Sequence, residues 1–420
     1  MRNNKTLLTV SDNNVDILFS HVAPLRSRLS SNQGDMMEPF KNNLSPQLVQ
    51  CFGLLLERHL SHFDKAEFEQ TIIQQLDALE LKERAAFIAE KLHQVLPKQE
   101  VIRFQIIRKM LRPVSGDLTV VQSDKDGITG WGTLPLGIVV SQFGYESFDD
   151  AMALLKDMTE HFSSEFDVRF FLIDDQDRAL DIMSNWLTHR SHHVRRLVSE
   201  GTRPRLPWAM QLPSIIKDPS ATLPLLTALR DDEHEYVRRS VANHLNDIAK
   251  DHPDLVAKLA VDWMNDAKKT LIDQPLLNRQ KLLRHACRTL IKQGHPVALE
   301  AFGVFPPKLD VSPIFLPSSE IHFGTELCFS VELHSSSDKD QSLIVDYVMH
   351  FKKANGKMAQ KVFKWKNVTL KARSHLSIEK AHGIKEITTR KYYPGTQAVS
   401  LQINGQPFGY NEFNLIMGEA

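Results

Sequence analysis

Residues 194–208 read VRRLVSEGTRPRLPW, and this stretch joins the end of a helix to a stiff loop. Its two valines and leucine are spaced one helical turn apart, which predicts an amphipathic helix that Glu200 closes. A glycine then supplies a stop signal, and two prolines prevent the helix from continuing. Arg203 and Arg205 should therefore lie on a constrained segment that ends at Trp208.

The stretch combines side chains that suit nucleic-acid recognition. The planar guanidinium group of arginine matches phosphate oxygens, and an indole can stack on a base or sugar. A second interpretation stays open for Arg195 and Arg196, because arginines that follow a valine in helical repeat proteins often pair with the neighbouring repeat. That interpretation accounts less well for the arginines that lie beside the prolines.

Two landmarks recur along the chain at one spacing. VRRLV at position 194 returns as VRRSV at position 237, and the His-Pro pair at position 252 returns at 295, so that both separations are 43 residues. This spacing is the period of a HEAT-type helix pair. We therefore expect a right-handed stack of helix pairs with a concave inner wall.

The residues before these repeats also show helical periodicity. Ser45 and Pro46 are typical of a helix start, as N-cap and first helical residue. Residues 113–133 contain Ser-Gly and Asp-Gly pairs that predict a long loop, and residues 1–36 are polar and predict a loosely ordered extension. The helical segments that we predict are 45–98, which holds several helices, 102–111, 134–143, 148–158, 162–172 and 178–187.

The pattern changes after residue 303. Segments such as LCFSVELHS and SLIVDYVMHF alternate polar and apolar residues, and Asn-Gly pairs at 355 and 404 predict tight hairpin turns. We expect an immunoglobulin-like β-sandwich that lacks the paired cysteines of antibody domains. The predicted organisation is thus multi-domain: an extension at 1–36, an all-α HEAT-like solenoid at 37–303 and an all-β sandwich at 304–420.

Basic residues concentrate in one part of the sandwich. Between positions 352 and 391 there are 12 lysines and arginines and two glutamates. Lysines that protect an exposed edge strand from aggregation are one explanation. Contact with a nucleic-acid backbone is the other, with Lys364 and Lys366 as candidates.

Composition is that of an ordinary globular protein, with zero formal net charge. The charge is unevenly distributed, because residues 37–160 hold 18 acidic and 13 basic residues, whereas residues 186–296 hold 12 acidic and 18 basic ones. The three cysteines are far apart and match no metal-ligand spacing. The sequence shows neither a membrane-spanning run nor a signal peptide, so we expect a cytoplasmic protein.

Common catalytic motifs for nucleotide binding, metalloproteolysis and serine hydrolysis do not occur in the sequence. What remains are carboxylates that we place on the inner helices of the basic array: Glu165, Glu200 and Asp247. Each one taken singly is explained equally well as an ion-pair partner or a helix cap. Together, facing a groove for an anionic polymer, they indicate chemistry rather than binding alone.

Four stretches, MEPFKNNLSPQLV, SSEFDVRFF, HVRRLVSEGTRPRLPWA and YVRRSVANHLNDIAKDHP, resemble those of the AlkC-type DNA alkylation-repair glycosylases. These form a branch of the HEAT-like glycosylase family that includes AlkD. The likeness covers about residues 37–303, and SEGTRPRLPW is its most specific part. Some members also carry an immunoglobulin-like domain after the repeats. Residues 131–143, where the AlkD branch has a catalytic aspartate, contain no acid here.

The resemblance implies a monofunctional glycosylase that removes cationic alkylated bases from duplex DNA as the first step of base excision repair. Its main substrate would be 3-methyladenine, with 3-methylcytosine as a second candidate. Catalytic residues would be Glu165, Glu200 and Asp247, with Trp208 at the substrate and with no metal or organic cofactor. Phosphate contacts would come from basic residues: Arg195, Arg196, Arg203, Arg205, Arg239, Lys364 and Lys366.

The family also implies a monomer that associates with the nucleoid when it binds DNA. Two other functions stay open at this point. A HEAT-repeat scaffold could bind a protein partner on its concave face, and a DNA-binding regulator could work without catalysis. Release of a free base from alkylated DNA distinguishes the three.

Overall fold

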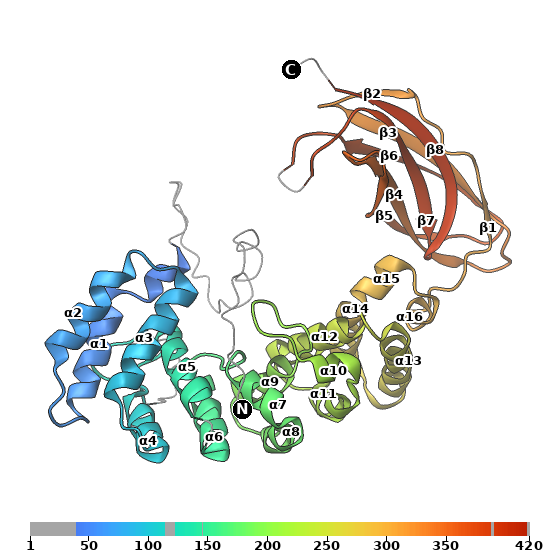
Figure 1. Cartoon of the computed structure of the whole chain (residues 1–420). Helices are drawn as coiled ribbons and strands as arrows, with labels where there is room; N and C mark the ends of the chain where they lie inside the picture. The colour runs from blue at the N-terminus through green and yellow to red at the C-terminus, as the bar shows by residue number, and fades with distance from the viewer. Residues whose placement is uncertain (1–38, 114–121, 145, 388–389, 418–420) are drawn as a thin grey trace. The chain divides into compact units, whose positions relative to one another are not determined.

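The computed structural model describes residues 39–113, 122–144, 146–387 and 390–417. Helices occupy the chain up to residue 300, and strands follow from residue 309 (Figure 1). This order confirms the predicted fold class, a helical array followed by an all-β domain. The predicted extension at 1–36 lies outside the described residues.

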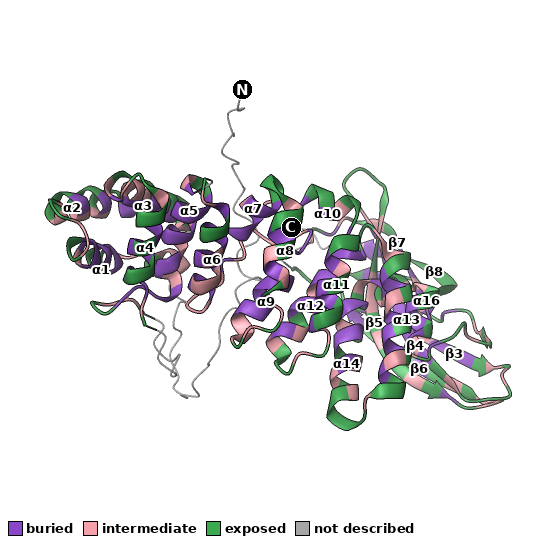
Figure 2. Ribbon diagram, turned by 90° about the horizontal axis from the view of Figure 1, so that it is seen from below, coloured by how far each residue is buried: buried purple, intermediate pink, exposed green. Residues whose placement is uncertain are grey.

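The first helices form short antiparallel pairs. Ser45 caps the first of them, because its side chain accepts a hydrogen bond from the Leu48 amide at 3.3 Å, as predicted. Buried and exposed residues alternate along these helices, as expected of amphipathic elements (Figure 2). The elements are η2 (Phe40–Asn43), α1 (Pro46–Glu57), α2 (Lys65–Leu76), α3 (Leu81–Val95), α4 (Glu100–Met110), η3 (Gly130–Gly132), α5 (Thr133–Phe143), α6 (Phe148–Thr159), α7 (Val168–Asp174) and α8 (Gln176–Ser184).

The prediction of a helix over 162–172 was wrong in its first half, since α7 begins at Val168. The preceding residues form turns in which Ser164 bonds to the end of α6 with both its amide and its hydroxyl group. The amide donates to Thr159 Oγ1 at 3.2 Å, and the hydroxyl donates to the Leu155 carbonyl at 3.0 Å. Serine side chains compete with helical hydrogen bonds in this way. As a result Glu165 lies in a turn and not on an inner helix.

The 43-residue period is confirmed in the second series of helices. Its two copies form α9 and α12, which pack against each other, and His252 and His295 are the N-cap residues of α13 and α16. The elements are α9 (His192–Gly201), α10 (Pro213–Lys217), η4 (Ser220–Thr222), α11 (Leu223–Leu229), α12 (Glu235–Ile248), α13 (Pro253–Thr270), α14 (Asp273–Ala286), α15 (Arg288–Gln293) and α16 (Pro296–Glu300).

The chain divides into two compact units, and the division does not follow the predicted boundary at 303/304. Unit 1 contains the described residues up to Ile182 together with Arg205–Leu212. Unit 2 contains Met183–Pro204 and everything from Pro213 onward, and so joins helices to the β domain. The chain therefore passes from one unit to the other three times.

The β domain has two sheets. One has the strand order β1-β3-β6, and the other has the order β2-β8-β7-β4-β5. All pairings are antiparallel except that of β2 with β8. The strands are β1 (Leu309–Val311), β2 (Glu320–His322), β3 (Glu326–Ser335), β4 (Gln341–Lys352), β5 (Met358–Leu370), β6 (His375–Gly383), β7 (Gly395–Ile403) and β8 (Gln406–Ile416).

A hydrophobic core fills the space between the sheets, with Leu333, Val345 and Leu401 fully or almost fully buried. The predicted turn at Asn404-Gly405 joins β7 to β8, and both residues have the positive φ angles, 46° and 79°, that such a two-residue turn requires. The three cysteines of the chain, all within the described residues, are free thiols.

The same turn contacts the helical part of unit 2. A Cβ atom on Gly294, which ends α15, would lie 2.8 Å from the carbonyl oxygen of Gly405. Next to it, the Gln402 side-chain amide donates to the Lys292 carbonyl at 3.0 Å. The backbones of Gly294 and Gly405 therefore meet so closely that neither glycine has room for a side chain.

Candidate active site

The last turns of α9 and α12 bring two carboxylates together, and an arginine just after α9 joins them. The side chains of Glu200, Arg203 and Asp247 are 6%, 9% and 3% exposed. Arg203 donates from NH1 to Glu200 Oε1 at 2.6 Å and from Nε to Asp247 Oδ2 at 2.8 Å. One guanidinium group thus bridges the two acids, which lie 47 positions apart in the sequence at residues 200 and 247.

Three more polar side chains complete this cluster. Ser240 donates to Glu200 Oε2 at 2.6 Å, and Arg196 NH2 lies 3.4 Å from Glu200 Oε1. The ammonium group of Lys250 donates to Asp247 Oδ1 at 2.9 Å, and its side chain is 46% exposed. We call Arg196, Glu200, Arg203, Ser240, Asp247 and Lys250 the clamp. Lys250 is its most exposed member.

Electrostatics keep Glu200 ionised. Burial alone would raise the pKa of Glu200, but the charges of Arg196 and Arg203 and the hydrogen bonds from Ser240 and Arg203 outweigh it and hold that pKa well below its usual range. Behind the clamp, His244 Nδ1 lies 2.9 Å from the Ser199 carbonyl, and burial lowers the pKa of this imidazole to about 4. A neutral histidine therefore ties α12 to the backbone beside Glu200.

Unit 1 holds the other predicted acid, Glu165. Ser163 Oγ donates to its carboxylate at 2.7 Å. Two residues later, Asp167 is 5% exposed and lies against α5, the helix of the segment 131–143 that has no acid of its own. Burial, opposed by the Ser141 hydrogen bond and increased by the charge of Glu165, raises the pKa of Asp167 to about 7.

Trp208 also belongs to unit 1 and has an unusual backbone. Its φ angle is 65°, a conformation that bulky residues seldom adopt and that costs free energy. The Lys82 ammonium group donates to the Trp208 carbonyl at 3.0 Å and lies 6.0 Å from the indole ring centroid. Such strain concentrates at functional positions, so it supports the selection of Trp208 as a site residue.

Some arginines predicted to contact phosphate are used inside the protein. Arg195 donates to both carboxylate oxygens of Asp232, at 2.6 and 3.0 Å, which is the pairing with a neighbouring repeat that the alternative interpretation described. Arg203 and Arg196 belong to the clamp and are likewise buried. These three arginines therefore have carboxylate partners inside the protein, and their contacts with phosphate stay predictions.

The remaining predicted DNA contacts lie nearer to solvent. Arg239 is exposed on α12, and Arg205 is half-buried, with NH1 donating to Gln211 Oε1 at 3.5 Å. Lys364 and Lys366 are exposed on β5, the edge strand of the larger sheet. These four positions are compatible with contacts to a ligand.

Sequence reasoning missed several residues of the site. Ser240 lies seven positions before Asp247, so helical spacing places it on the same side of α12 and could have identified it, and Lys250 follows Asp247 by three positions, just after the helix ends. Asp167 was within the quoted motif SSEFDVRFF and was passed over in favour of Glu165. Lys82 and His244 had no signal in the sequence that we can name.

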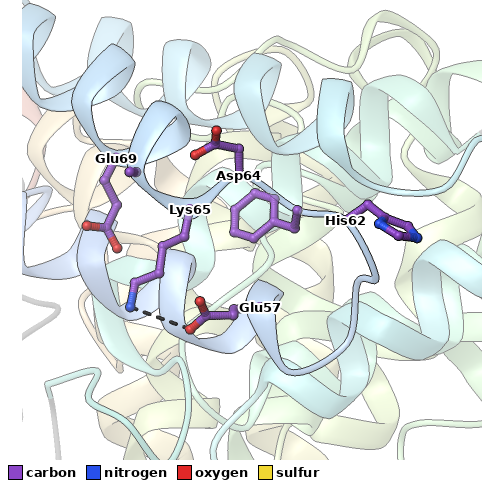
Figure 3. Close-up of a pocket in the computed structure, with 7 residues that line it drawn as sticks. Glu57, His62, Asp64, Lys65 and Glu69 are labelled. Carbon is purple, nitrogen blue, oxygen red and sulfur yellow. Dashed lines mark ion pairs between the residues drawn. The ribbon is translucent and has the colours of Figure 1, made fainter.

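Hollows on the surface lie elsewhere. One of about 550 Å³ lies on the α1–α2 hairpin, where Lys65 Nζ is 3.6 Å from Glu57 Oε2 (Figure 3), and it contains none of the predicted site residues. Another, of about 570 Å³, lies on β4 and β5. It is lined by five cations: Lys352, Lys353, Lys361, Arg390 and Lys391.

Metal-binding clusters and membrane-spanning helices are absent from the described part of the chain. Among these residues no group of three or more histidines, cysteines or acids could hold a metal ion. No helix within the same ranges is both long and apolar enough to cross a membrane. The clamp and the residues around Glu165 and Trp208 are therefore the candidates for chemistry.

Comparisons with known proteins agree with both parts of the fold. The family model "Uncharacterised protein YhaZ, C-terminal Ig-like domain" matches residues 310–417. The Bacillus subtilis (strain 168) protein YhaZ is 34% identical over 374 residues, which cover 89% of this chain and 97% of the relative. The structure of Pseudomonas fluorescens alkylpurine DNA glycosylase AlkC, bound to DNA containing an abasic site analog, has a TM-score of 0.72 and 32% identity, over 90% of this chain and 100% of that one. The chain therefore belongs to the family of AlkC- and YhaZ-like proteins, in which a HEAT-like helical array precedes an immunoglobulin-like domain.

Proposed function

We propose that this protein is a monofunctional DNA glycosylase that hydrolyses the N-glycosidic bond of cationic alkylated bases in duplex DNA. 3-Methyladenine is the main proposed substrate, and 3-methylcytosine is the second. The observation that carries the proposal is the clamp itself, two buried carboxylates bridged by Arg203 beside the segment that most resembles AlkC-type enzymes. The likeness over 90% of the chain to AlkC bound to abasic DNA supports it.

The chemistry of such substrates explains why carboxylates suffice. A base alkylated on a ring nitrogen carries a positive charge, so the bond from C1′ to nitrogen breaks with its electron pair going to the base, which leaves as a neutral molecule. No general acid is needed. Positive charge develops on the sugar, water adds to C1′, and the proton that water loses must pass to a base. Carboxylates serve both needs, as electrostatic stabilisers and as proton acceptors.

Within the clamp we assign these roles to Glu200 and Asp247. Arg203 contacts both carboxylates, and together with Arg196 it keeps Glu200 anionic despite its burial. Lys250 pairs with Asp247 Oδ1 and is half-exposed, so this oxygen is the one closest to an approach from solvent. In unit 1, Glu165 is the third proposed catalytic acid, and Trp208 is proposed to stack on the deoxyribose or the lesion.

The decisive experiment is release of free base. A duplex that contains 3-methyladenine is incubated with the full chain, and the released base is quantified. Glu200→Gln and Asp247→Asn should reduce release roughly ten- to a thousandfold, the usual effect of losing one electrostatic stabiliser. Binding to an abasic duplex should stay near the wild-type level. Glu233→Gln is the matched control, because its side chain is 77% exposed.

The outcomes separate the proposal from its alternatives. Absence of base release by the wild-type chain would favour a scaffold or a DNA-binding regulator. Release at the wild-type rate by both variants would contradict the assigned carboxylates while leaving the reaction standing. Tight duplex binding without release would indicate the regulator.

Duplex DNA is the proposed partner of a monomer, and the β domain is proposed to bind its backbone. The support is the hollow with five cations and the exposed pair Lys364 and Lys366 on an edge strand. Each phosphate contact that is lost lowers the slope of log affinity against log salt by about 0.9. Lys364→Ala with Lys366→Ala should thus lower the slope by roughly two contacts' worth, and Lys308→Ala with Lys339→Ala is the control pair. Unchanged slopes would assign these lysines to edge protection.

A further inference from the structure

Asp167 occupies a recess on α5 that is formed at Gly137 and Ser141, and we call this recess the seat. Its carboxyl group is 5% exposed, and Ser141 Oγ donates to its Oδ1 at 3.4 Å. One helical turn earlier, a Cβ atom at Gly137 would lie 2.7 Å from Asp167 Cγ. Glycine at 137 therefore leaves the space that the carboxyl group fills.

Helix formation does not explain this seat. Asp167 is the N-cap residue of α7, but its side chain makes no capping hydrogen bond to the described turns of that helix. A buried carboxyl group whose hydroxyl partner lies 3.4 Å away costs stability, and an alanine or asparagine would avoid most of that cost. Acids kept in such surroundings are candidates for a functional role.

The seat also determines where Glu165 lies. The turn that carries Glu165 is fixed on one side by Ser164, which bonds to the Leu155 carbonyl and to Thr159 on α6. It is fixed on the other side by Asp167, which lies against α5. Glu165 stands between these anchors, and Ser163 bonds to its carboxylate.

We propose that Asp167 is a positioning residue that holds Glu165 in place and sets the negative charge beside it. This inference rests on the proposed catalytic role of Glu165. Asp167 itself need not touch the substrate. The seat would make Glu165 part of a pair of acids whose total charge depends on pH.

The groups that the structure places at Asp167 come from its own turn and from α5. α7 packs against α5 and α6; α5 contributes the uncharged Gly137 and Ser141 at the seat, and Glu165 is the charged group that acts on Asp167. Burial, opposed by the hydrogen bond from Ser141 and by the Asp167 backbone amide, and assisted by Glu165, raises the pKa of Asp167 to about 7. The pair should therefore gain a second negative charge as the pH rises through 7.

The test is the pH dependence of base release at saturating enzyme. In the wild-type chain a second negative charge near the sugar should increase the rate roughly tenfold as the pH rises from 5.5 to 8.5, the order expected for one charge at this range in a protein. Asp167→Asn fixes the pair in its singly charged form. This variant should match the wild-type rate at pH 5.5, be roughly tenfold slower at pH 8.5 and bind abasic duplex as well as the wild type does.

Two further variants separate positioning from folding. Gly137→Ala should displace the carboxyl group and slow release at every pH, whereas Gly53→Ala on α1 is a control in which the new Cβ atom meets the flexible Glu69 side chain. Asp157→Asn, a half-exposed acid on α6, controls for charge. Carbon-13 NMR of the Asp167 carboxyl group, assigned by its loss in Asp167→Asn, should show a titration near pH 7 without any assay of activity.

Each result has a defined meaning. Parallel pH profiles for wild type and Asp167→Asn, or a titration of the Asp167 carboxyl group near pH 4, would overturn the inference. Base release by the wild type would still support the proposed function in that case. A uniform loss at all pH values in Asp167→Asn would also overturn it, because a purely structural role predicts that pattern. Failure of the wild type to release base would overturn the proposed function and, with it, the role of Glu165.

Discussion

Two pairs of acids in this protein illustrate opposite solutions to the burial of a carboxyl group. In unit 2, Glu200 and Asp247 are bridged by Arg203 and contacted by Arg196 and Lys250. In unit 1, Asp167 is equally buried, but it meets Ser141, a glycine and the like charge of Glu165. Neighbouring cations lower the pKa of Glu200 in spite of its burial, whereas burial raises the pKa of Asp167, so the surroundings and not the residue type decide the two shifts.

The largest effect should come from breaking the clamp. Arg203→Met leaves two buried carboxylates without their shared cation, which should lower the free energy of unfolding by about 5 kcal/mol, the upper end for a broken buried ion pair. Denaturant unfolding at pH 7 measures it, with Lys258→Met on the exposed side of α13 as control. A loss equal to that of the control would mean that the clamp is solvated and that the contrast between the pairs is small.

The pair in unit 1 should respond in the opposite direction. Burial raises the pKa of Asp167 from 3.8 to about 7, so its ionisation costs at most about 4 kcal/mol, and Asp167→Asn should recover part of that. The native state binds the extra proton between these values, so the wild type loses stability as the pH rises from 4 to 7. The gain of the variant should thus be absent at pH 4 and complete above pH 7. Chemical unfolding across this pH range measures the gain in stability, with Asp157→Asn as control. A gain of the same size at every pH would contradict the raised pKa of Asp167.

Acid unfolding sharpens the contrast further. The pKa of Glu200 is lowered from 4.5 to about 2, so its contribution is complete above pH 4.5 and is lost as the pH falls toward 2. Stability of the wild type should therefore fall on that acid side, and Glu200→Gln should flatten this part of the curve by about 3 kcal/mol. Unfolding of both proteins between pH 2 and 5 tests it. A parallel decline in the two would show that other carboxylates control acid unfolding.

The smallest effects compare two serines that occupy equivalent roles. Ser240 donates to ionised Glu200 at 2.6 Å, and Ser141 donates to Asp167 at 3.4 Å. Since hydrogen bonds to charged groups are the stronger ones, Ser240→Ala should cost about 2 kcal/mol and Ser141→Ala about 0.5 kcal/mol at pH 6. Equal losses in thermal unfolding would indicate that both acids carry the same charge.

Local signals in the sequence predicted much of the fold. The 43-residue period located α9 and α12, and the Asn-Gly pair located the β7–β8 turn, because helical periodicity and turn chemistry depend on neighbours along the chain. The segment 162–172 was harder, since Ser163 and Ser164 satisfy hydrogen bonds with side chains and delay the helix until Val168. Periodicity could not predict this start, because the apolar spacing does not show whether serine side chains replace the hydrogen bonds of a helix.

The candidate site was predicted less completely. Glu200, Asp247 and Trp208 were singled out by their positions in the sequence and given roles by resemblance, and those roles remain predictions. What sequence reasoning could not provide was the partner of each charge, since Arg195 pairs with Asp232 and Arg203 with two acids at once. Such ion pairs join residues that are tens of positions apart, and their contribution to stability depends on burial. For the same reason Asp167 was overlooked, although it lies two residues from Glu165.

The chain passes between the two units three times, and this affects which recombined genes can encode an intact unit 1. Unit 1 is completed by Arg205–Leu212, a segment encoded after the first residues of unit 2. A recombination event that exchanged the gene at one point between Ile182 and Arg205 would therefore deliver a unit 1 whose Arg205–Leu212 segment, with Trp208, comes from the other parent. Exchange near the start of the β domain divides unit 2 but leaves both segments of unit 1 with one parent, so we expect active chimaeras of this family to have junctions there more often than between residues 182 and 205.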